Sequence, residues 1–171
     1  MELYTILSAG FVLLAPEVFR VFAGREFWEG VNWIPLFVTG YYMNFLCTFP
    51  INYEYYRKKT KAVAVVTILA SAVNIGLNAV LIRRVGIGGA ALATTASHVL
   101  QFALHYLYAR YRLGGKEYPF TVRRWLVYAA AYFAVAAGTY FLPEAWLLRW
   151  GAGALLGIWE LYRIYRRKTL F

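Results

Sequence analysis

The sequence predicts an all-α membrane protein, a polytopic bundle of about six transmembrane helices. Hydrophobic residues make up 61% of its 171 residues and charged residues only 15%, which leaves too few polar side chains to cover a water-soluble fold. Apolar runs of about 20 residues, the length that crosses a bilayer as a helix, recur along the chain. Aromatic residues reach 19%, and Trp and Tyr collect at the boundary between lipid and water.

The first two spans are predicted from Leu3 to about Ala23 and from about Trp33 to Tyr53. Polar residues in the last turns of the first run, such as Arg20, place that end at the membrane interface. The connection over 22–33 mixes charged residues with aromatic ones such as Trp28. It is predicted to be either an amphipathic segment lying in the interface or a plain loop.

Four further spans are predicted: from Ala62 to Ile82, from Gly88 to about Tyr108, from Trp125 to Leu142, and from about Ala145 to Tyr162. The last two are short for a bilayer crossing. Pro143 and Glu144 would form the tight turn between them, so that the two runs form a closely paired helical hairpin.

The distribution of Lys and Arg predicts an orientation. Of the 18 basic residues, thirteen fall within the connections at 57–61 and 110–124 and in the tail at 163–168, and the other five lie on the opposite side. Basic residues in short connections mark the cytoplasmic side. We therefore expect both termini to be cytoplasmic, in a multi-pass protein of the cytoplasmic (inner) membrane. The net charge of +10 follows this topology, so no nucleic-acid partner is expected.

Enzyme chemistry is not predicted. The two histidines, His98 and His105, share a helix that contains no carboxylate, and the acidic residues are scattered at the ends of the runs. No phosphate-binding loop or dinucleotide fingerprint occurs, and Cys47 lies alone within an apolar run. We expect no catalytic residue, no cofactor and no metal site.

Polar residues within the spans are the most informative feature. Asn74 and Asn78 are four residues apart and share a helix face, and His98, Gln101 and His105 do so on the next helix. Asn44 and Asn52 are also roughly aligned on the second helix. Two interpretations stay open: interhelical hydrogen bonds, worth about 0.6 kcal/mol each, or a hydrophilic transport cavity.

Small residues at four-residue spacing predict close helix packing in three places. The stripes are Gly89, Ala93 and Ser97; Ala130, Ala134 and Gly138; and Gly153 with Gly157.

A basic cluster, Arg57, Lys58 and Lys59, follows three nearby tyrosines at the end of the second run. It is interpreted either as a topology-setting interface anchor or as a contact for anionic lipid headgroups or a pyrophosphate-linked substrate.

A series of short motifs resembles the C-terminal half of polysaccharide-biosynthesis flippases, the O-antigen-type oligosaccharide-lipid translocases of the MOP superfamily. The series reads APEVF at 15–19, GREF at 24–27, EYYRKKTK at 54–61, TIL at 67–69, NIGLN at 74–78 and GIGGAALAT at 86–94. Residues 1–112 would be the helices one to four of the flippase lobe, and 113–171 two additional C-terminal transmembrane helices.

The resemblance implies the last six helices of a transporter of about 12 to 14 helices, with a central cavity that alternates its access. The N-terminal lobe would be missing from this chain and would be its partner. The substrate would be a polyprenyl-pyrophosphate-linked saccharide. Asn74, Asn78, His98 and Gln101 would line the cavity, and Lys58 and Lys59 would lie at its cytoplasmic mouth.

Two other functions stay open. A multidrug or toxin exporter of the same superfamily would be expected to use an intramembrane carboxylate for ion coupling. A small membrane scaffold without transport activity would be a helical bundle that assembles with partner helices.

Overall fold

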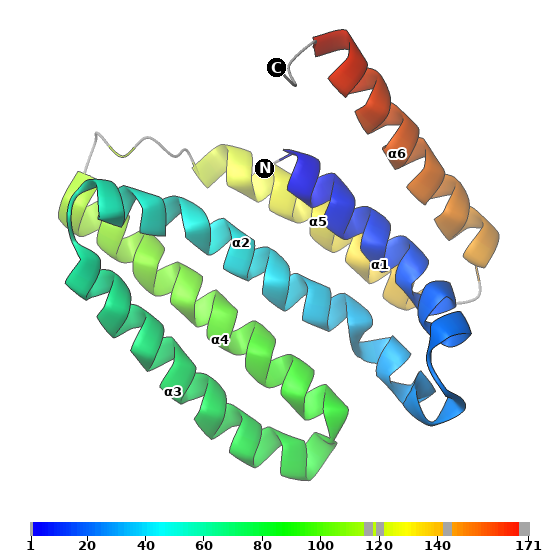
Figure 1. Ribbon diagram of the computed structural model, residues 1–171, viewed down its shortest axis with the longest axis horizontal. Helices are drawn as coiled ribbons and strands as arrows, with labels where there is room; N and C mark the ends of the chain where they lie inside the picture. Colours follow the sequence, from blue (N-terminus) through cyan, green and yellow to red (C-terminus); the bar gives the residue numbers. More distant parts are fainter. Residues whose placement is uncertain (1, 115–117, 119–121, 142–144, 168–171) are drawn as a thin grey trace. The chain divides into compact units, whose positions relative to one another are not determined.

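The computed structural model describes residues 2–114, 118, 122–141 and 145–167, and these residues are almost entirely helical (Figure 1). The elements are α1 (Glu2–Phe22), the 3-10 helix η1 (Arg25–Trp33), α2 (Ile34–Tyr56), α3 (Thr60–Val85), α4 (Ile87–Leu107), the π-helix η2 (Tyr108–Gly114), α5 (Val122–Phe141) and α6 (Trp146–Arg167). No strand occurs among the described residues, so the predicted all-α fold is confirmed.

The predicted runs agree with the helices to within a few residues at most ends. Between the first two, η1 shows that the connection is helical rather than a plain loop, and its position in the interface stays a prediction. The fourth run continues beyond Tyr108 as η2. The turn predicted at Pro143 and Glu144 lies outside the described residues.

Four helical stretches of the described chain are long and apolar enough to cross a membrane. They are Leu3–Phe22, Trp28–Tyr56, Thr60–Val85 and Ile87–Gly114. In α5 the apolar stretch, Val127–Thr139, is shorter. Helix α6 is not among the four, because Arg149, Glu160 and Arg163 interrupt its apolar sequence.

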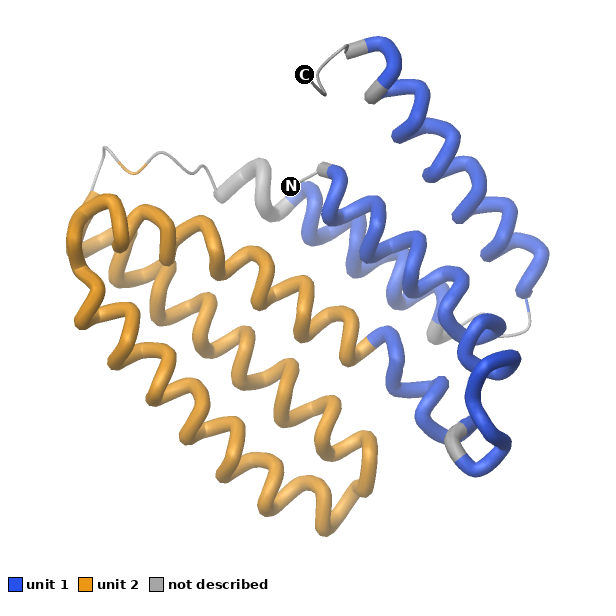
Figure 2. Tube along the Cα trace, in the orientation of Figure 1, with its two compact units in different colours: residues 1–35, 123–171 blue, residues 36–122 orange. Residues whose placement is uncertain are grey.

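The chain forms two compact units (Figure 2). Unit 1 comprises residues 1–35 and 123–171, and unit 2 comprises residues 36–122. The division expected at residue 112 concerned sequence resemblance rather than packing, and it stays a prediction.

In unit 2, α3 and α4 pack at very short range after a tight turn. Gly86 makes this turn with φ +63, a left-handed conformation that favours glycine. A Cβ added to Gly89 would lie 2.2 Å from the backbone oxygen of Leu81. The predicted small-residue stripe of α4 is therefore buried, and its Ser97 hydroxyl donates to the backbone oxygen of Ala93 at 2.7 Å.

Helix α4 is also joined to α2. The Thr95 hydroxyl of α4 donates to the backbone oxygen of Leu36 at 2.8 Å. A Cβ on Gly40 of α2 would lie 3.0 Å from the Thr95 Oγ1. Unit 2 is thus built around α4, which contacts α3 through its glycines and α2 through Thr95.

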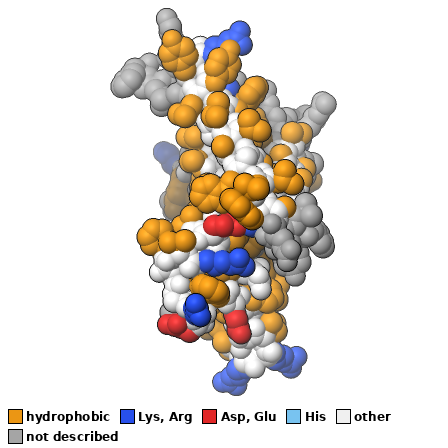
Figure 3. Space-filling view, turned by 90° about the vertical axis from the view of Figure 1, so that its right-hand side faces the viewer, with side chains coloured by type: hydrophobic (Ala, Val, Ile, Leu, Met, Phe, Trp, Pro, Cys, Tyr) orange, Lys and Arg blue, Asp and Glu red, His pale blue; other side chains and the backbone are white. Residues whose placement is uncertain are grey.

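In unit 1, α1 packs against α6. The side of α6 that bears Arg149, Gly153 and Glu160 is the more buried one, whereas apolar residues such as Leu155 and Trp159 are exposed. Such an arrangement suits a bilayer, where polar groups are sheltered by protein and apolar ones meet lipid. Figure 3 shows hydrophobic side chains over much of one face of the molecule, with acidic and basic side chains together in its lower half.

The small-residue prediction for the last two helices is met only in part. On α5, Ala130 and Ala134 are exposed and a Cβ on Gly138 would meet nothing within 4 Å, so close packing along this stripe is a wrong prediction for the described residues. On α6, Gly153 faces Leu14 of α1, whereas Gly157 has open space. The spacing of small residues shows that they share a helix face, but it does not show whether another helix packs against that face.

Candidate functional site

A stripe of exposed polar side chains runs along α2. It comprises Tyr41, Asn44, Thr48, Asn52 and Tyr55, whose spacing of three or four residues places them on one helix face. Sequence reasoning had aligned the two asparagines but missed the other three members. The signal was present in the three-to-four spacing, which continues the same face in both directions. We call these five residues the α2 polar stripe.

The exposed side of α3 has the opposite character. Val65, Ile68, Leu69, Ile75 and Val80 are all at least half exposed. Aliphatic side chains of this kind suit direct contact with lipid tails. Amides and hydroxyls do not, because hydrocarbon offers them no hydrogen-bonding partner. The α2 polar stripe therefore marks a face for water, substrate or another protein surface, and α3 a face for lipid.

The predicted pair on α3 is confirmed as close neighbours, but its hydrogen bonds are within one helix. Asn78 and Asn74 are both half-buried. The Asn78 side-chain amide donates to the Asn74 side-chain oxygen at 3.0 Å and to the Asn74 backbone oxygen at 3.0 Å. Interhelical hydrogen bonding was one of the two interpretations left open for this pair. The hydrogen bonds that the structure gives it are intrahelical, of a kind available to any two asparagines four residues apart on a helix.

On α4, His98 and Gln101 are half-buried, and His98 lies beside α2. The His98 ring lies 6.0 Å from the ring of Tyr41, the first member of the α2 polar stripe. Its Nδ1 is buried without a hydrogen-bond partner. Within the described parts of the chain, no hydrogen bond joins Asn74 or Asn78 to either residue. Of the four expected cavity residues, only Asn74 and Asn78 are joined to each other by a hydrogen bond among the described residues.

A buried pair that was not predicted joins α2 to α4. The Nδ1 atom of His105 lies 2.9 and 3.1 Å from the two carboxylate oxygens of Glu54, and both side chains are 0% exposed. A carboxylate facing Nδ1 favours the tautomer in which Nδ1 carries the proton and donates it. The other ring nitrogen, Nε2, is buried without a partner. The helix of the two histidines contains no carboxylate, as the sequence shows, and the carboxylate partner of His105 comes from another helix, α2.

The basic cluster forms the turn that ends α2. The backbone amide of Lys59 donates to the carbonyl of Glu54 at 2.9 Å, and that of Lys58 to the carbonyl of Tyr55 at 2.9 Å. This is the Schellman pattern, and Lys58 takes the left-handed position with φ 56, where glycine is usual. Arg57, Lys58 and Lys59 are exposed. The backbone is thus fixed by hydrogen bonds, while the three cations remain accessible to an anion.

Aromatic rings pack beside this end of unit 2. Tyr118 lies edge-on to Tyr53 at 5.1 Å and to Tyr106 at 5.8 Å between ring centroids. Ala109 and Leu113 complete the cluster. Burial raises the pKa of Tyr118 well above its ordinary value. The phenol is therefore neutral at physiological pH, and the cluster ties residue 118 to α2 and α4.

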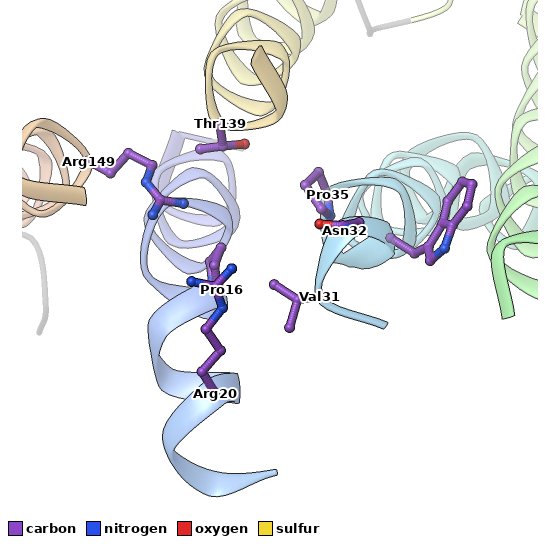
Figure 4. Close-up of a pocket in the computed structure, with 8 residues that line it drawn as sticks. Pro16, Arg20, Val31, Asn32, Pro35, Thr139 and Arg149 are labelled. Atoms are coloured by element: carbon purple, nitrogen blue, oxygen red, sulfur yellow. The ribbon is translucent and has the colours of Figure 1, made fainter. Parts of the chain in front are cut away.

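Unit 1 contains a cavity of about 410 Å³ (Figure 4). Its polar lining residues are Arg20, Asn32, Trp33, Thr139 and Arg149, and its apolar ones are Pro16, Val31 and Pro35. They come from the end of α1, from η1 and the start of α2, from α5 and from the start of α6. In Figure 4 the Arg20 and Arg149 side chains extend toward each other along α1.

One of these arginines is anchored by an ion pair. Arg149 of α6 donates through a terminal guanidinium nitrogen to Glu17 of α1, and the two side chains are 7% and 23% exposed. The Arg149 Nε and the second Glu17 carboxylate oxygen are buried without hydrogen-bond partners. Leaving such a group unsatisfied costs about 1–3 kcal/mol. The pair therefore holds α6 to α1 but leaves hydrogen-bonding capacity beside the cavity.

Both units thus present polar or basic side chains, along α2 in one and around the cavity in the other. The described residues contain no group of three or more His, Cys, Asp or Glu that could hold a metal ion. What they do contain is exposed amides and hydroxyls on α2 and exposed cations in the turn that follows it, groups whose chemistry suits polar or anionic ligands.

Comparison with known proteins identifies the family. The family model described as lipid II flippase MurJ matches residues 3–159, and the match continues across residue 112. Comparison with curated proteins and with solved structures gives no match. The expected kind of protein, a flippase of the MOP superfamily, is confirmed, whereas the O-antigen subclass receives no support. The chain belongs to the lipid II flippase MurJ family, whose members are membrane transporters rather than enzymes.

Proposed function

We propose that this chain takes part in moving a polyprenyl-pyrophosphate-linked cell-wall precursor, lipid II, across the cytoplasmic membrane. Family membership supports the class of transporter. The observation that carries the proposal within this chain is the α2 polar stripe, which places exposed amides and hydroxyls along a membrane-spanning helix. A glycan headgroup that crosses a bilayer needs such groups in exchange for its water.

Roles for individual residues follow from this arrangement. Asn44 and Asn52 of the α2 polar stripe line the path of the headgroup, with His98 beside Tyr41 at its edge. Asn74, Asn78 and Gln101 contribute polar groups from α3 and α4. The cations Arg57, Lys58 and Lys59 contact the pyrophosphate at the cytoplasmic end, with both termini on that side.

Lipid II and an O-antigen-type oligosaccharide on a polyprenyl carrier share the lipid and the pyrophosphate, and they differ in the glycan. The basic turn would serve both. Family membership favours lipid II as the substrate. Because the two substrates differ in the glycan, the residues of the α2 polar stripe that face the glycan would determine which one is bound.

The test is a translocation assay in cells that depend on the gene for this protein. Depletion is expected to lower the amount of lipid II at the outer face of the cytoplasmic membrane. The double variant Asn44→Leu/Asn52→Leu is expected to fail to restore that amount. Val73→Leu, on the exposed apolar side of α3, is the matched control. Unchanged outer-face lipid II on depletion would refute the proposed substrate.

The same strains separate the other functions. Loss of surface oligosaccharide with normal lipid II would identify the O-antigen-type substrate, and intracellular accumulation of a cationic drug would identify an exporter. A scaffold role would leave all three unchanged while removing a partner protein from the membrane.

A further inference from the structure

The cavity of unit 1 has a positive lining that is only partly neutralised. Arg20 and Arg149 line it, and no acidic side chain does so among the described residues. Glu17 pairs with Arg149. Arg20 makes no ion pair within the part of the chain that the structure describes. One positive charge therefore remains beside the cavity.

Arg149 has the features of a residue in a built site. Its side chain is only 7% exposed and one nitrogen is held by Glu17. Its Nε is buried and has no hydrogen-bond partner. A buried guanidinium that lacks a partner for one donor and lines a cavity is complementary to an acceptor with several oxygens. The cavity volume of about 410 Å³ falls within the range of small-molecule pockets, about 300–1,000 Å³.

The surroundings of the cavity are those of a membrane interface. It lies at the C-terminal end of α1 and the N-terminal end of α6. Phe22 and Trp146, which are 86% and 54% exposed, present apolar surface at the same helix ends. Trp33 lines the cavity itself. Aromatic side chains at helix ends mark the depth at which lipid headgroups lie.

We propose that this cavity binds the phosphate ester of a membrane lipid headgroup. The guanidinium groups of Arg20 and Arg149 donate hydrogen bonds to the phosphate oxygens. Arginine suits this role better than lysine, because its donors form a planar fork that can bind two oxygens at once. Glu17 positions Arg149 and does not contact the ligand. The site does not depend on the α2 polar stripe or on transport, so it can be tested without a translocation assay.

The experiment measures lipid binding to the purified full chain in dodecyl maltoside by native mass spectrometry. The probes are dioleoyl phosphatidic acid, which carries a phosphate ester, dioleoylglycerol, which has the same chains without it, and inorganic phosphate. The test variant is Arg20→Gln, because this exposed residue has no ion pair whose loss would unfold the protein. Arg83→Gln is the matched control: the same change at an exposed arginine that does not line the cavity.

Phosphatidic acid is expected to bind, and dioleoylglycerol is expected not to bind. Arg20→Gln is expected to weaken the binding of phosphatidic acid at least about tenfold, which is the effect of losing one charge-assisted hydrogen bond. Arg83→Gln is expected to leave it unchanged. Binding of inorganic phosphate with the same dependence on Arg20 would support the site and identify free phosphate as the source. Equal binding of dioleoylglycerol, or equal loss in Arg83→Gln, would overturn the proposal.

Discussion

The two units each join a pair of helices with an acidic and a basic side chain, and they do so in different surroundings. In unit 2, Glu54 and His105 are both 0% exposed and lie within a tightly packed core. In unit 1, Glu17 and Arg149 are 23% and 7% exposed and lie beside a cavity. The first pair is closed and the second is open on one side.

The difference concerns what such a pair can do. A pair that is fully surrounded by protein has no room for a ligand, and its contribution is to fix α2 against α4. A pair at the wall of a cavity also fixes two helices, but its unsatisfied donors remain available. The same chemistry therefore serves structure in one unit and offers binding in the other. Three predictions test this contrast between the units, and a fourth concerns the polar pair of α3.

The largest effect is expected from His105→Ala, which leaves the Glu54 carboxylate buried without a partner. Breaking a buried pair in this way costs about 3–5 kcal/mol of unfolding free energy. The measurement is SDS-induced unfolding of the purified chain in detergent micelles. The double variant Glu54→Gln/His105→Gln removes the charge and is expected to recover much of the loss. A single variant as stable as the wild type would show that the pair does not hold unit 2.

Glycine substitutions compare the packing of the two units directly. Gly89→Ala places a Cβ 2.2 Å from the Leu81 backbone oxygen and forces α3 and α4 apart, which costs about 1–3 kcal/mol. Gly153→Ala in α6 meets Leu14 at 3.5 Å, an ordinary contact, and is expected to be neutral. Unfolding curves of the two variants give the comparison. Equal losses would mean that α1 and α6 pack as tightly as α3 and α4.

Glu17→Gln breaks the open pair and is expected to cost about 1–2 kcal/mol, less than the closed pair, because the adjoining cavity admits water to Arg149. The same unfolding assay measures it. Glu26→Gln, an exposed residue of η1, serves as the control. A loss as large as that of His105→Ala would contradict the distinction between the two pairs.

Asn78→Ala is expected to change stability least, by about 0.2–0.5 kcal/mol, because it removes hydrogen bonds between residues four apart within one helix at a half-buried position. If Asn78 faces the substrate path, translocation falls in this variant although stability does not. Reduced unfolding free energy in proportion to reduced transport would instead assign Asn78 to packing.

Sequence reasoning placed the helices well and the site only in part. The α2 polar stripe was represented by Asn44 and Asn52, but Tyr41, Thr48 and Tyr55 were not recognised as its members. Asn74 and Asn78 were recognised as a pair, and their bond proved to be internal to α3. The ion pairs were missed because their members are 51 and 132 residues apart. A single sequence contains no signal that joins residues at such separations.

What the sequence determined by itself is the class of protein and the bounds of its helices, because hydropathy and helix length are local properties that a bilayer selects directly. Only the tertiary structure decided which face of each helix is covered. In lipid, an apolar side chain is equally suited to a helix neighbour and to a hydrocarbon tail, so composition does not distinguish the two. The packing of the helices against one another decides which residues are covered. It leaves the stripe of α2 exposed, buries the glycines of α4 and forms the cavity beside Arg149.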